Sequence, residues 1–189
     1  MSNETGKRIA QLERQNDTLY RKIMAESEGS RLDIGAGKWP LPDSEPYDLE
    51  QGDAQTMTPR PKQESYALVW SSHLLEHLEN PIDALNCWWE LVKPLGYLWL
   101  LLPDFRLHEH GFWPSRNKKH LWGMSLSNVG FPRVLDMYQI VRTHLRVIWV
   151  CRETICDEGY DYTRMYDRSF DQSAGAAQVS IEIVLQKPG

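Results

Sequence analysis

The chain has 189 residues, of which 41% are hydrophobic and 25% are charged, and its formal net charge is −5. This length and composition are typical of one globular domain and exclude a disordered or low-complexity chain. The acidic balance argues against nucleic acid as a partner, because a nucleic-acid surface needs a basic face. The longest apolar run, Tyr97 to Leu102, is too short to span a bilayer.

The cysteines favour a reducing compartment. There are three of them, none in a C-x-x-C pair, which suits the cytosol better than a disulfide scaffold. The first residues are polar and lack the apolar segment of a signal peptide. We therefore expect a cytoplasmic protein without a membrane span.

Residues 1–28 are expected to form an N-terminal segment that is helical from about residue 5, and Gly29 and Ser30 separate it from a main domain, residues 29–189. Apolar or seam positions recur at intervals of three and four: Ile9, Leu12, Asn16, Leu19 and Ile23. Two interpretations are open. The segment forms a short coiled coil that makes a homodimer or binds a partner protein, or it is an amphipathic helix lying on its own domain.

Strands and helices alternate along the main domain. Apolar strands are expected at residues 31–34, 66–70, 97–102, 145–151 and 179–185, with a proline-rich loop after the first. Asn80 is expected to cap a helix that starts at Pro81 and is ended by Pro94–Gly96. A second helix is expected over residues 131–144. This alternation predicts an α/β fold with a parallel sheet.

Gly35 and Gly37 follow directly on the first expected strand. Glycines at such a turn let the backbone approach a ligand closely, and in a doubly wound sheet ligands bind at the carboxyl ends of the strands. The pattern is typical of a nucleotide site, although an ordinary tight turn is the alternative.

Further motifs follow this turn in a fixed order: Leu32–Gly37, Gly52–Gln55, Tyr66–Leu78, Leu91–Leu98 and Leu102–Asp104. This series resembles the class I S-adenosylmethionine-dependent methyltransferases, particularly the small ones with a Leu-Glu-His-Leu motif, here Leu75–Leu78. The resemblance covers residues 31–104 and returns weakly in the final strand. It implies a Rossmann-like, mostly parallel sheet with an antiparallel C-terminal strand.

The resemblance also implies S-adenosylmethionine as the cofactor and a set of residues that line its pocket. Asp33 would lie near the ammonium of the cofactor, Asp48 would bind the ribose hydroxyls, and Asp53 would accept from the adenine amino group. The full set is Asp33, Gly35, Ala36, Gly37, Asp48, Asp53, Ala54, Ser71, Ser72 and His73.

Two departures from the family pattern lie in the first half of the main domain. Lys38 and Trp39 stand where a third glycine is usual. The interval from Gly37 to Asp53 is short, whereas the family usually has a helix, a strand and another helix there. A crossover between parallel strands takes about a dozen residues or more. We therefore expect reduced helices in this half, a pared-down or partly open pocket, and weak cofactor binding.

His73, Glu76 and His77 match the H-x-x-E-H pattern, which on a helix places two imidazoles for zinc in metallopeptidases. Here the match begins directly after a strand, and neither a long flanking helix nor a further acidic ligand is evident. We therefore predict no metal site, with His73 facing the cofactor pocket and His77 as a structural residue.

Residues 103–130 are expected to form a loop or lid over the acceptor site. Methyl transfer from a sulfonium needs positioning and, for a hydroxyl or amine acceptor, a base. His110 and His120 are the predicted bases, with Asp104 as the residue that orients them. The same group, which includes His108 and Glu109, offers two alternatives: a metal that ionises a hydroxyl acceptor, or a solvated polar loop.

Basic and aromatic side chains accompany these histidines. Two interpretations are open for the basic residues: they bind an acidic or phosphorylated acceptor, or they form only a solvated face. Two are also open for the tryptophans: they stack on a sugar, or they lie in the core of the lid. These side chains are Arg106, Arg116, Lys118, Lys119, Trp113 and Trp122. The sequence thus predicts a methyltransferase acting on an oxygen or nitrogen of a small-molecule or glycan-type acceptor. The alternative is a non-catalytic, methyltransferase-like scaffold or partner-binding module.

Overall fold

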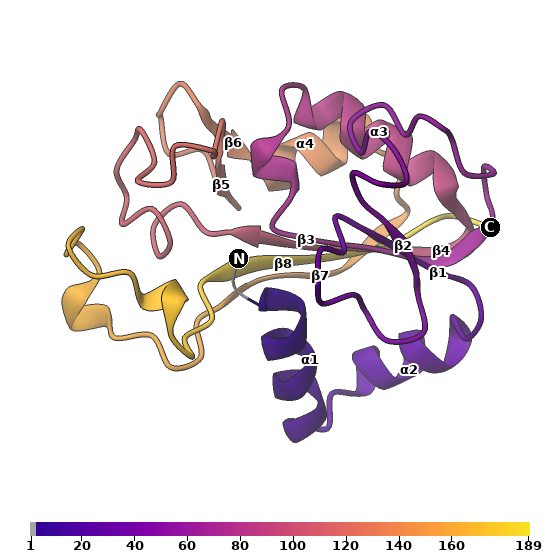
Figure 1. Ribbon diagram of the computed structural model, residues 1–189, viewed down its shortest axis with the longest axis horizontal. Coiled ribbons are helices and arrows are strands. Elements are labelled where there is room, and N and C mark those ends of the chain that lie inside the picture. The colour runs from indigo at the N-terminus through magenta and orange to yellow at the C-terminus, as the bar shows by residue number, and fades with distance from the viewer. Residues whose placement is uncertain (1–2) are drawn as a thin grey trace.

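The computed structural model describes residues 3–189, in which a six-stranded sheet lies between two layers of helices (Figure 1). The strand order is β2-β1-β3-β4-β8-β7. The parallel strands are β1 (Arg31–Ile34), β2 (Glu45–Tyr47), β3 (Tyr66–Ser72) and β4 (Val92–Pro103). Strand β8 (Ser180–Gln186) runs antiparallel between β4 and β7 (Trp149–Cys156). The predicted α/β fold with an antiparallel C-terminal strand is confirmed.

Each face of the sheet packs against one pair of helices (Figure 1). Side chains alternate along the strands, so Val69 and Leu98 pack on one side with α3 (Pro81–Leu91) and α4 (Met137–His144). Trp70 and Trp99 pack on the other side with α1 (Glu4–Arg14) and α2 (Thr18–Glu26). No helix in residues 3–189 is long and apolar enough to cross a membrane.

The N-terminal segment differs from the single helix expected over residues 5–28. The chain turns at Asn16, which has a φ of 57°, and Asp17 starts α2 by accepting a hydrogen bond from the backbone N–H of Tyr20 at 2.8 Å. Leu12 and Ile23, both on the predicted seam, are fully buried against the sheet. The structure therefore supports the amphipathic interpretation and gives no support to a coiled coil. Residues 1–2 of the predicted segment lie outside the described residues.

Residues 35–44 connect β1 to β2 without a helix. The sequence predicted only a proline-rich loop here, which is wrong in one respect: Glu45–Tyr47 is a strand, with Leu32 opposite Glu45 and Ile34 opposite Tyr47. No helix lies between β2 and β3 either, which confirms the expectation of reduced helices in this half. The helices α1 and α2 cover the sheet face that a crossover helix would otherwise occupy.

The boundaries around α3 also differ from the prediction. The helix ends at Leu91, and β4 begins at once and runs through Pro94–Gly96, which the sequence analysis took as the break before a strand. Asn80 precedes the helix, but its side chain makes no capping hydrogen bond. Proline at the first helical position therefore sets the start of α3 without the expected cap.

The predicted helix over residues 131–144 and the predicted strand over 145–151 both begin later. Short strands β5 (Gly123–Ser125) and β6 (Val134–Asp136) pair with each other before α4. Asp136 then caps α4 by accepting from the backbone N–H of Gln139 at 3.0 Å. Pairing of β6 thus uses residues that the apolar pattern assigned to the helix.

The carboxylate of Glu182 joins the sheet to the N-terminal helices. It is fully buried in β8. Arg8 of α1 donates to its two oxygens at 2.7 and 2.6 Å, and Arg152 of β7 donates at 2.9 Å. Arg152 also donates to Asp17 at 2.8 Å. A buried charge is tolerated only when it is paired in this way.

Replacing Glu182 by glutamine should destabilise the fold strongly, because the buried guanidinium of Arg8 loses its counter-charge and the partly buried one of Arg152 keeps only Asp17. We expect Glu182→Gln to lower the free energy of unfolding by about 3–5 kcal/mol, measured by urea denaturation. Glu158→Gln is the matched control, since Glu158 pairs with Arg14 at an exposed site and such pairs contribute about 1 kcal/mol or less. Equal losses in the two variants would contradict this role for Glu182.

Candidate functional site

The carboxyl ends of β1, β3 and β4 meet at one edge of the sheet, on the left in Figure 1. Ile34 lies opposite Ser71, and Ser72 lies opposite Leu101. The turn after β1, the segment after β3 and the loop after β4 therefore begin beside one another. This is the edge at which the sequence placed its site residues.

The glycine turn packs tightly on the segment that follows β3. Gly35 and Gly37 have φ values of +79° and +55°, in the left-handed region that glycine adopts without strain. A Cβ on Gly35 would lie 2.7 Å from Cδ2 of Leu74, so a larger residue would displace Leu74 as well as strain the backbone. A Cβ on Gly37 would meet nothing nearer than 4.0 Å, so the space beside Gly37 is open.

The structure brings Asp48 to the glycine turn in spite of the short connection. One oxygen of Asp48 accepts from the backbone N–H of Gly37 at 2.7 Å, and the other accepts from the N–H of Leu49 at 2.8 Å. Asp48 is partly exposed and the side chain of Leu49 is 91% exposed. A carboxylate and an apolar side chain thus stand together at the open side of the turn.

Asp33 and Ala36 lie beneath the turn and are both buried. Asp33 accepts from the backbone N–H of Leu41 at 2.7 Å and so holds the segment that leads to β2. Burial raises the pKa of Asp33 to about 7, against the opposing effect of the Leu41 hydrogen bond and with a smaller contribution from Asp48. Asp33 therefore stabilises the turn from a buried position, and this structural role does not depend on a bound ligand.

Ser71, Ser72 and His73 end β3 at the same edge. The hydroxyls of both serines are buried and have no hydrogen-bond partner among residues 3–189. His73 has a φ of +52°, and its Nε2 lies 2.9 Å from the hydroxyl of Ser180. Burial, followed by the neighbouring histidines, lowers the pKa of His73 well below its usual value. Because buried hydroxyls usually have hydrogen-bond partners, two serine hydroxyls without partners beside an open glycine turn are suited to bind a polar ligand.

Asp53 and Ala54 belong to a separate exposed turn. The carboxylate of Asp53 accepts from the backbone N–H of Gln55 and the hydroxyl of Thr56, both at 2.8 Å, and these bonds lower its pKa. The carbonyl of Ala54 accepts from the indole N–H of Trp88 at 2.7 Å. Within the described chain no hydrogen bond joins this turn to Gly35–Gly37, so the predicted adenine contact stays a prediction.

Asp104 and His110 both stabilise the backbone. Asp104 accepts from the N–H groups of Arg106 and Leu107 at 2.9 and 3.0 Å, and its burial raises its pKa. His110 is buried and donates from Nδ1 to the carbonyl of Met165 at 2.6 Å. In residues 3–189 no hydrogen bond joins Asp104 to either predicted base. The catalytic roles of these residues therefore remain predictions.

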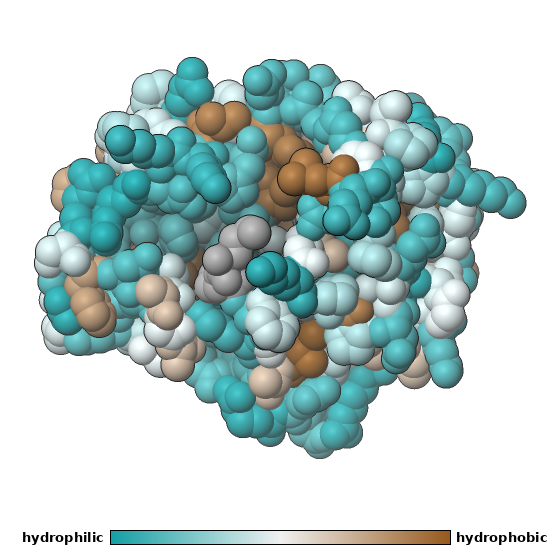
Figure 2. All heavy atoms as spheres, in the orientation of Figure 1, coloured by the Kyte–Doolittle hydropathy of each residue, from teal (hydrophilic) through white to brown (hydrophobic). Residues whose placement is uncertain are grey.

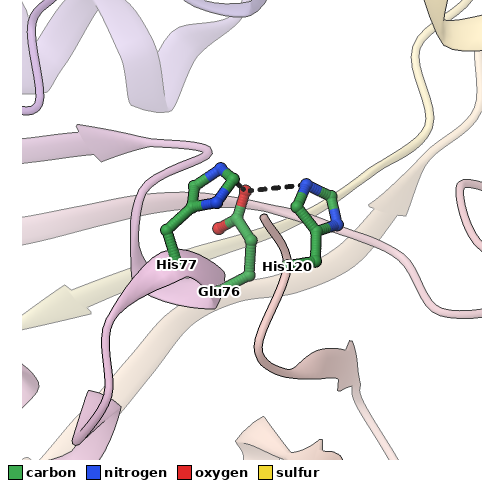
Figure 3. A group of neighbouring side chains, drawn as sticks. All are labelled: Glu76, His77 and His120. Carbon is green, nitrogen blue, oxygen red and sulfur yellow. Dashed lines mark ion pairs between the residues drawn. The ribbon is translucent and has the colours of Figure 1, made fainter. Parts of the chain in front are cut away.

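Tertiary folding brings Glu76 and His77 to the predicted base His120. Glu76 and His77 lie in the short turn η1 (Leu75–His77) after β3. The backbone N–H groups of Leu121 and Trp122 donate to the carbonyl of Glu76 at 2.8 and 3.2 Å. Figure 3 shows His77 and His120 on either side of the Glu76 carboxylate.

Two buried carboxylates have opposite environments in this cluster. Glu109 accepts from Nδ1 of His120 at 2.6 Å, and Nδ1 of His108 lies 3.4 Å from the same oxygen; the two imidazoles outweigh burial and hold the pKa of Glu109 well below its usual value. Glu76 is fully buried without a hydrogen-bond partner for either side-chain oxygen among residues 3–189, and burial raises its pKa to about 8. Glu76 is a candidate functional residue that the sequence indicates only through its place in the H-x-x-E-H spacing.

Comparisons with known proteins agree with this arrangement. Residues 32–100 match a family model described as a methyltransferase domain. No curated protein matches the chain. The family match thus covers residues 32–100 and supports the resemblance to the S-adenosylmethionine-dependent methyltransferases. This similarity implies S-adenosylmethionine as the cofactor, in agreement with the sequence motifs.

Solved structures show the same fold at low sequence identity. A protein from Archaeoglobus fulgidus called a SAM-dependent methyltransferase is 14% identical, with a TM-score of 0.54; the alignment covers 98% of this chain and 95% of that one. One from Mesorhizobium loti is 11% identical, with a TM-score of 0.53 and coverage of 89% and 97%. A methyltransferase complex of Haloferax volcanii with the Trm112 methyltransferase activator matches with 14% identity and a TM-score of 0.60, covering 96% and 93%.

The buried carboxyl of Asp33 should make the methyltransferase fold less stable as the pH rises. Because the folded-state pKa is raised, the folded chain keeps a proton between about pH 4 and pH 7 that the unfolded chain has lost, so stability falls across this range. Asp33→Asn removes this effect and keeps an oxygen for Leu41.

We expect Asp33→Asn to gain stability relative to the natural chain as the pH rises from 4 to 8. The gain should reach about 4 kcal/mol at most, at about 1.4 kcal/mol per pKa unit, measured by urea denaturation at several pH values. Glu50→Gln, at an exposed acid, serves as the control. A pH-independent difference between Asp33→Asn and the natural chain would show that Asp33 ionises normally.

Proposed function

We propose that the protein transfers the methyl group of S-adenosylmethionine to an oxygen or nitrogen of a small-molecule or glycan-type acceptor. The observation that carries this proposal is the meeting of the open glycine turn, the Asp48 carboxylate and the unpartnered serine hydroxyls at one sheet edge. The cofactor supplies a methyl group on a sulfonium. The neutral thioether that remains after transfer is a good leaving group and needs no acid assistance. The residues of the chain therefore act by binding, orienting and accepting a proton.

The arrangement around Gly37 suits the nucleoside part of the cofactor. Asp48 is held by Gly37 and Leu49 with its carboxylate partly exposed, which fits two adjacent ribose hydroxyls as donors. Leu49 offers an apolar surface for a planar base beside it. Ser71 and Ser72 offer hydroxyls for the polar methionine end. Asp33 orients the turn from below.

The loop after β4 and residues 157–177 lie beyond the same edge and would form the acceptor site (Figure 1). On the face shown in Figure 2, this end of the molecule is mainly hydrophilic, which favours a polar acceptor. Arg116, Lys118 and Lys119 are exposed on the loop and fit an acidic or phosphorylated group. Exposed Phe112 and Tyr166 offer aromatic surfaces on which a sugar ring can stack.

A proton must leave a hydroxyl or protonated amine acceptor during transfer. His120 is better placed than His110 to take it, because Glu109 binds Nδ1 of His120 and leaves Nε2 as the basic atom. His110 instead joins the loop to Met165. Asp104 contacts neither histidine through a hydrogen bond within residues 3–189, so its contribution would be to shape the loop.

Asp48→Asn should weaken cofactor binding without unfolding the chain. Asparagine keeps one acceptor for Gly37 but loses the charge and the second acceptor for the ribose. We expect the Kd for S-adenosylhomocysteine to rise roughly tenfold to a hundredfold, measured by calorimetric titration. Asp43→Asn, at a nearby exposed acid, is the control and should leave the Kd unchanged. Equal affinities for the natural chain and Asp48→Asn would remove Asp48 from the pocket.

Methyl transfer should appear as formation of S-adenosylhomocysteine when the chain is mixed with cofactor and sugar acceptors. A panel of neutral, phosphorylated and amino sugars separates oxygen from nitrogen acceptors, and we expect turnover with at least one. His120→Asn should lower kcat by roughly a hundredfold or more, as loss of a general base does. Tight binding of S-adenosylhomocysteine with no turnover across the panel would favour the non-catalytic scaffold instead.

A further inference from the structure

Three side chains place potential metal-ligand atoms around one buried point (Figure 3). Nε2 of His77 lies 3.6 Å from Oε1 of Glu76, and Nε2 of His120 lies 3.9 Å from the same oxygen. The three ligand atoms all lie within 4.8 Å of one another. Glu76 and His77 come from η1 and His120 from the loop after β4, so only the folded chain assembles the group.

The hydrogen bonds of the two imidazoles fix where their protons are. Nδ1 of His77 lies 2.9 Å from the carbonyl of Lys119, and Nδ1 of His120 lies 2.6 Å from the carboxylate of Glu109. Both partners only accept hydrogen bonds, so Nδ1 carries the hydrogen in each neutral ring. Each Nε2 therefore presents a lone pair at the point that the Glu76 carboxylate also faces.

Three acceptors facing one another inside a protein need a positive charge between them. Glu76 is fully buried, and its two oxygens have no hydrogen-bond partner in the described part of the chain. Nδ1 of His73 lies 3.9 Å from Oε1 of Glu76, which is too long for a hydrogen bond. A buried carboxylate left in this state is costly, so a cation or a proton belongs at this point.

We propose that Glu76, His77 and His120 bind one divalent transition-metal ion of the zinc type. Two imidazoles and one carboxylate are a ligand set of open zinc sites, in which a water or substrate takes the fourth position. Ligand atoms on a tetrahedral zinc ion lie about 3.4 Å apart. The two distances to Glu76, 3.6 and 3.9 Å, need to close by a few tenths of an ångström, and the two imidazole nitrogens, which lie within 4.8 Å of each other, by about 1.4 Å at most.

The residues around the three ligands fit the same interpretation. Ligating histidines usually donate their other N–H to a carboxylate or a backbone carbonyl, which orients the ring. Glu109 does this for His120 and the carbonyl of Lys119 does it for His77. The His77 side chain is 29% exposed, so solvent reaches the site from its side.

Metal binding assigns His120 a different role from the one in methyl transfer. An ion on Nε2 of His120 prevents this atom from accepting a proton, so in the metal-bound protein His120 is a ligand and not a base. The ion also joins η1 to the loop over the acceptor site. Metal binding does not depend on cofactor binding, so a failure of either proposal leaves the other testable.

The test uses the full chain without an affinity tag, stripped with a chelator, loaded with excess zinc and passed through a desalting column. We expect about one zinc ion per chain by mass spectrometry of the metal content, and a rise in Tm on loading. Co²⁺ in place of zinc should give the visible absorption bands of tetrahedral coordination. This measurement needs no variant and so does not depend on how any variant folds.

Variants then assign the ligands by zinc titration. Glu76→Gln keeps the shape of the side chain and should weaken zinc binding by roughly a hundredfold or more, whereas Glu109→Gln should weaken it by about 10–100-fold as a supporting residue. His144→Gln, at an exposed histidine of α4, is the matched control and should bind zinc as the natural chain does.

Two results would overturn the proposal: a folded natural chain that retains no zinc or cobalt after loading, or Glu76→Gln binding zinc as tightly as His144→Gln. If, in addition, Glu76→Gln raises the Tm of the metal-free chain, the charge at this point is a proton on Glu76, because the glutamine amide then supplies the missing donor.

Discussion

Residues 35–44 lead from β1 to the parallel strand β2 without a helix, so this part of the chain leaves one face of the sheet bare. A sheet this apolar on both faces must be covered, and α1 and α2 cover it with Leu12 and Ile23. The buried Glu182 carboxylate holds α1 against the sheet, because Arg8 of α1 and Arg152 of β7 both donate hydrogen bonds to it. The N-terminal helices are therefore part of the core and not an appendage.

The same short connection shapes the cofactor edge. Because β2 follows β1 so closely, Asp48 reaches the N–H of Gly37 directly, and Asp33 is buried under the segment that replaces a helix. A helix N-terminus after the glycines would add a favourable dipole for the cofactor, and this chain lacks one. In the proposed cofactor pocket, the side chains at this edge, including Asp48, would then provide the contacts that such a helix would otherwise supply.

Beyond this edge, the loop after β4 docks on η1 through the carbonyl of Glu76. That docking brings His120 to Glu76 and His77 and places Glu109 behind His120. The proposed acceptor site and the proposed metal site therefore share one loop, and any contact that orders this loop affects both. Since Gly35 packs on Leu74, between His73 and η1, the cofactor turn is also in contact with this region.

The sequence by itself determined the alternation of strands and helices and the glycine turn, because apolar periodicity and local motifs act within short segments, and its family resemblance implied the cofactor and the antiparallel last strand. It missed the break at Asn16, the strand at Glu45–Tyr47 and the late start of α4. At these places strand pairing and helix capping, and not the local apolar pattern, determine the structure. Nor could a local pattern show that Glu182 is buried, because its burial depends on α1 and β7 supplying Arg8 and Arg152. Only the tertiary structure brought His120, more than forty residues away in the chain, to Glu76 and His77. A spacing pattern records neighbours along the chain, whereas a ligand set depends on which loops the folded sheet brings together.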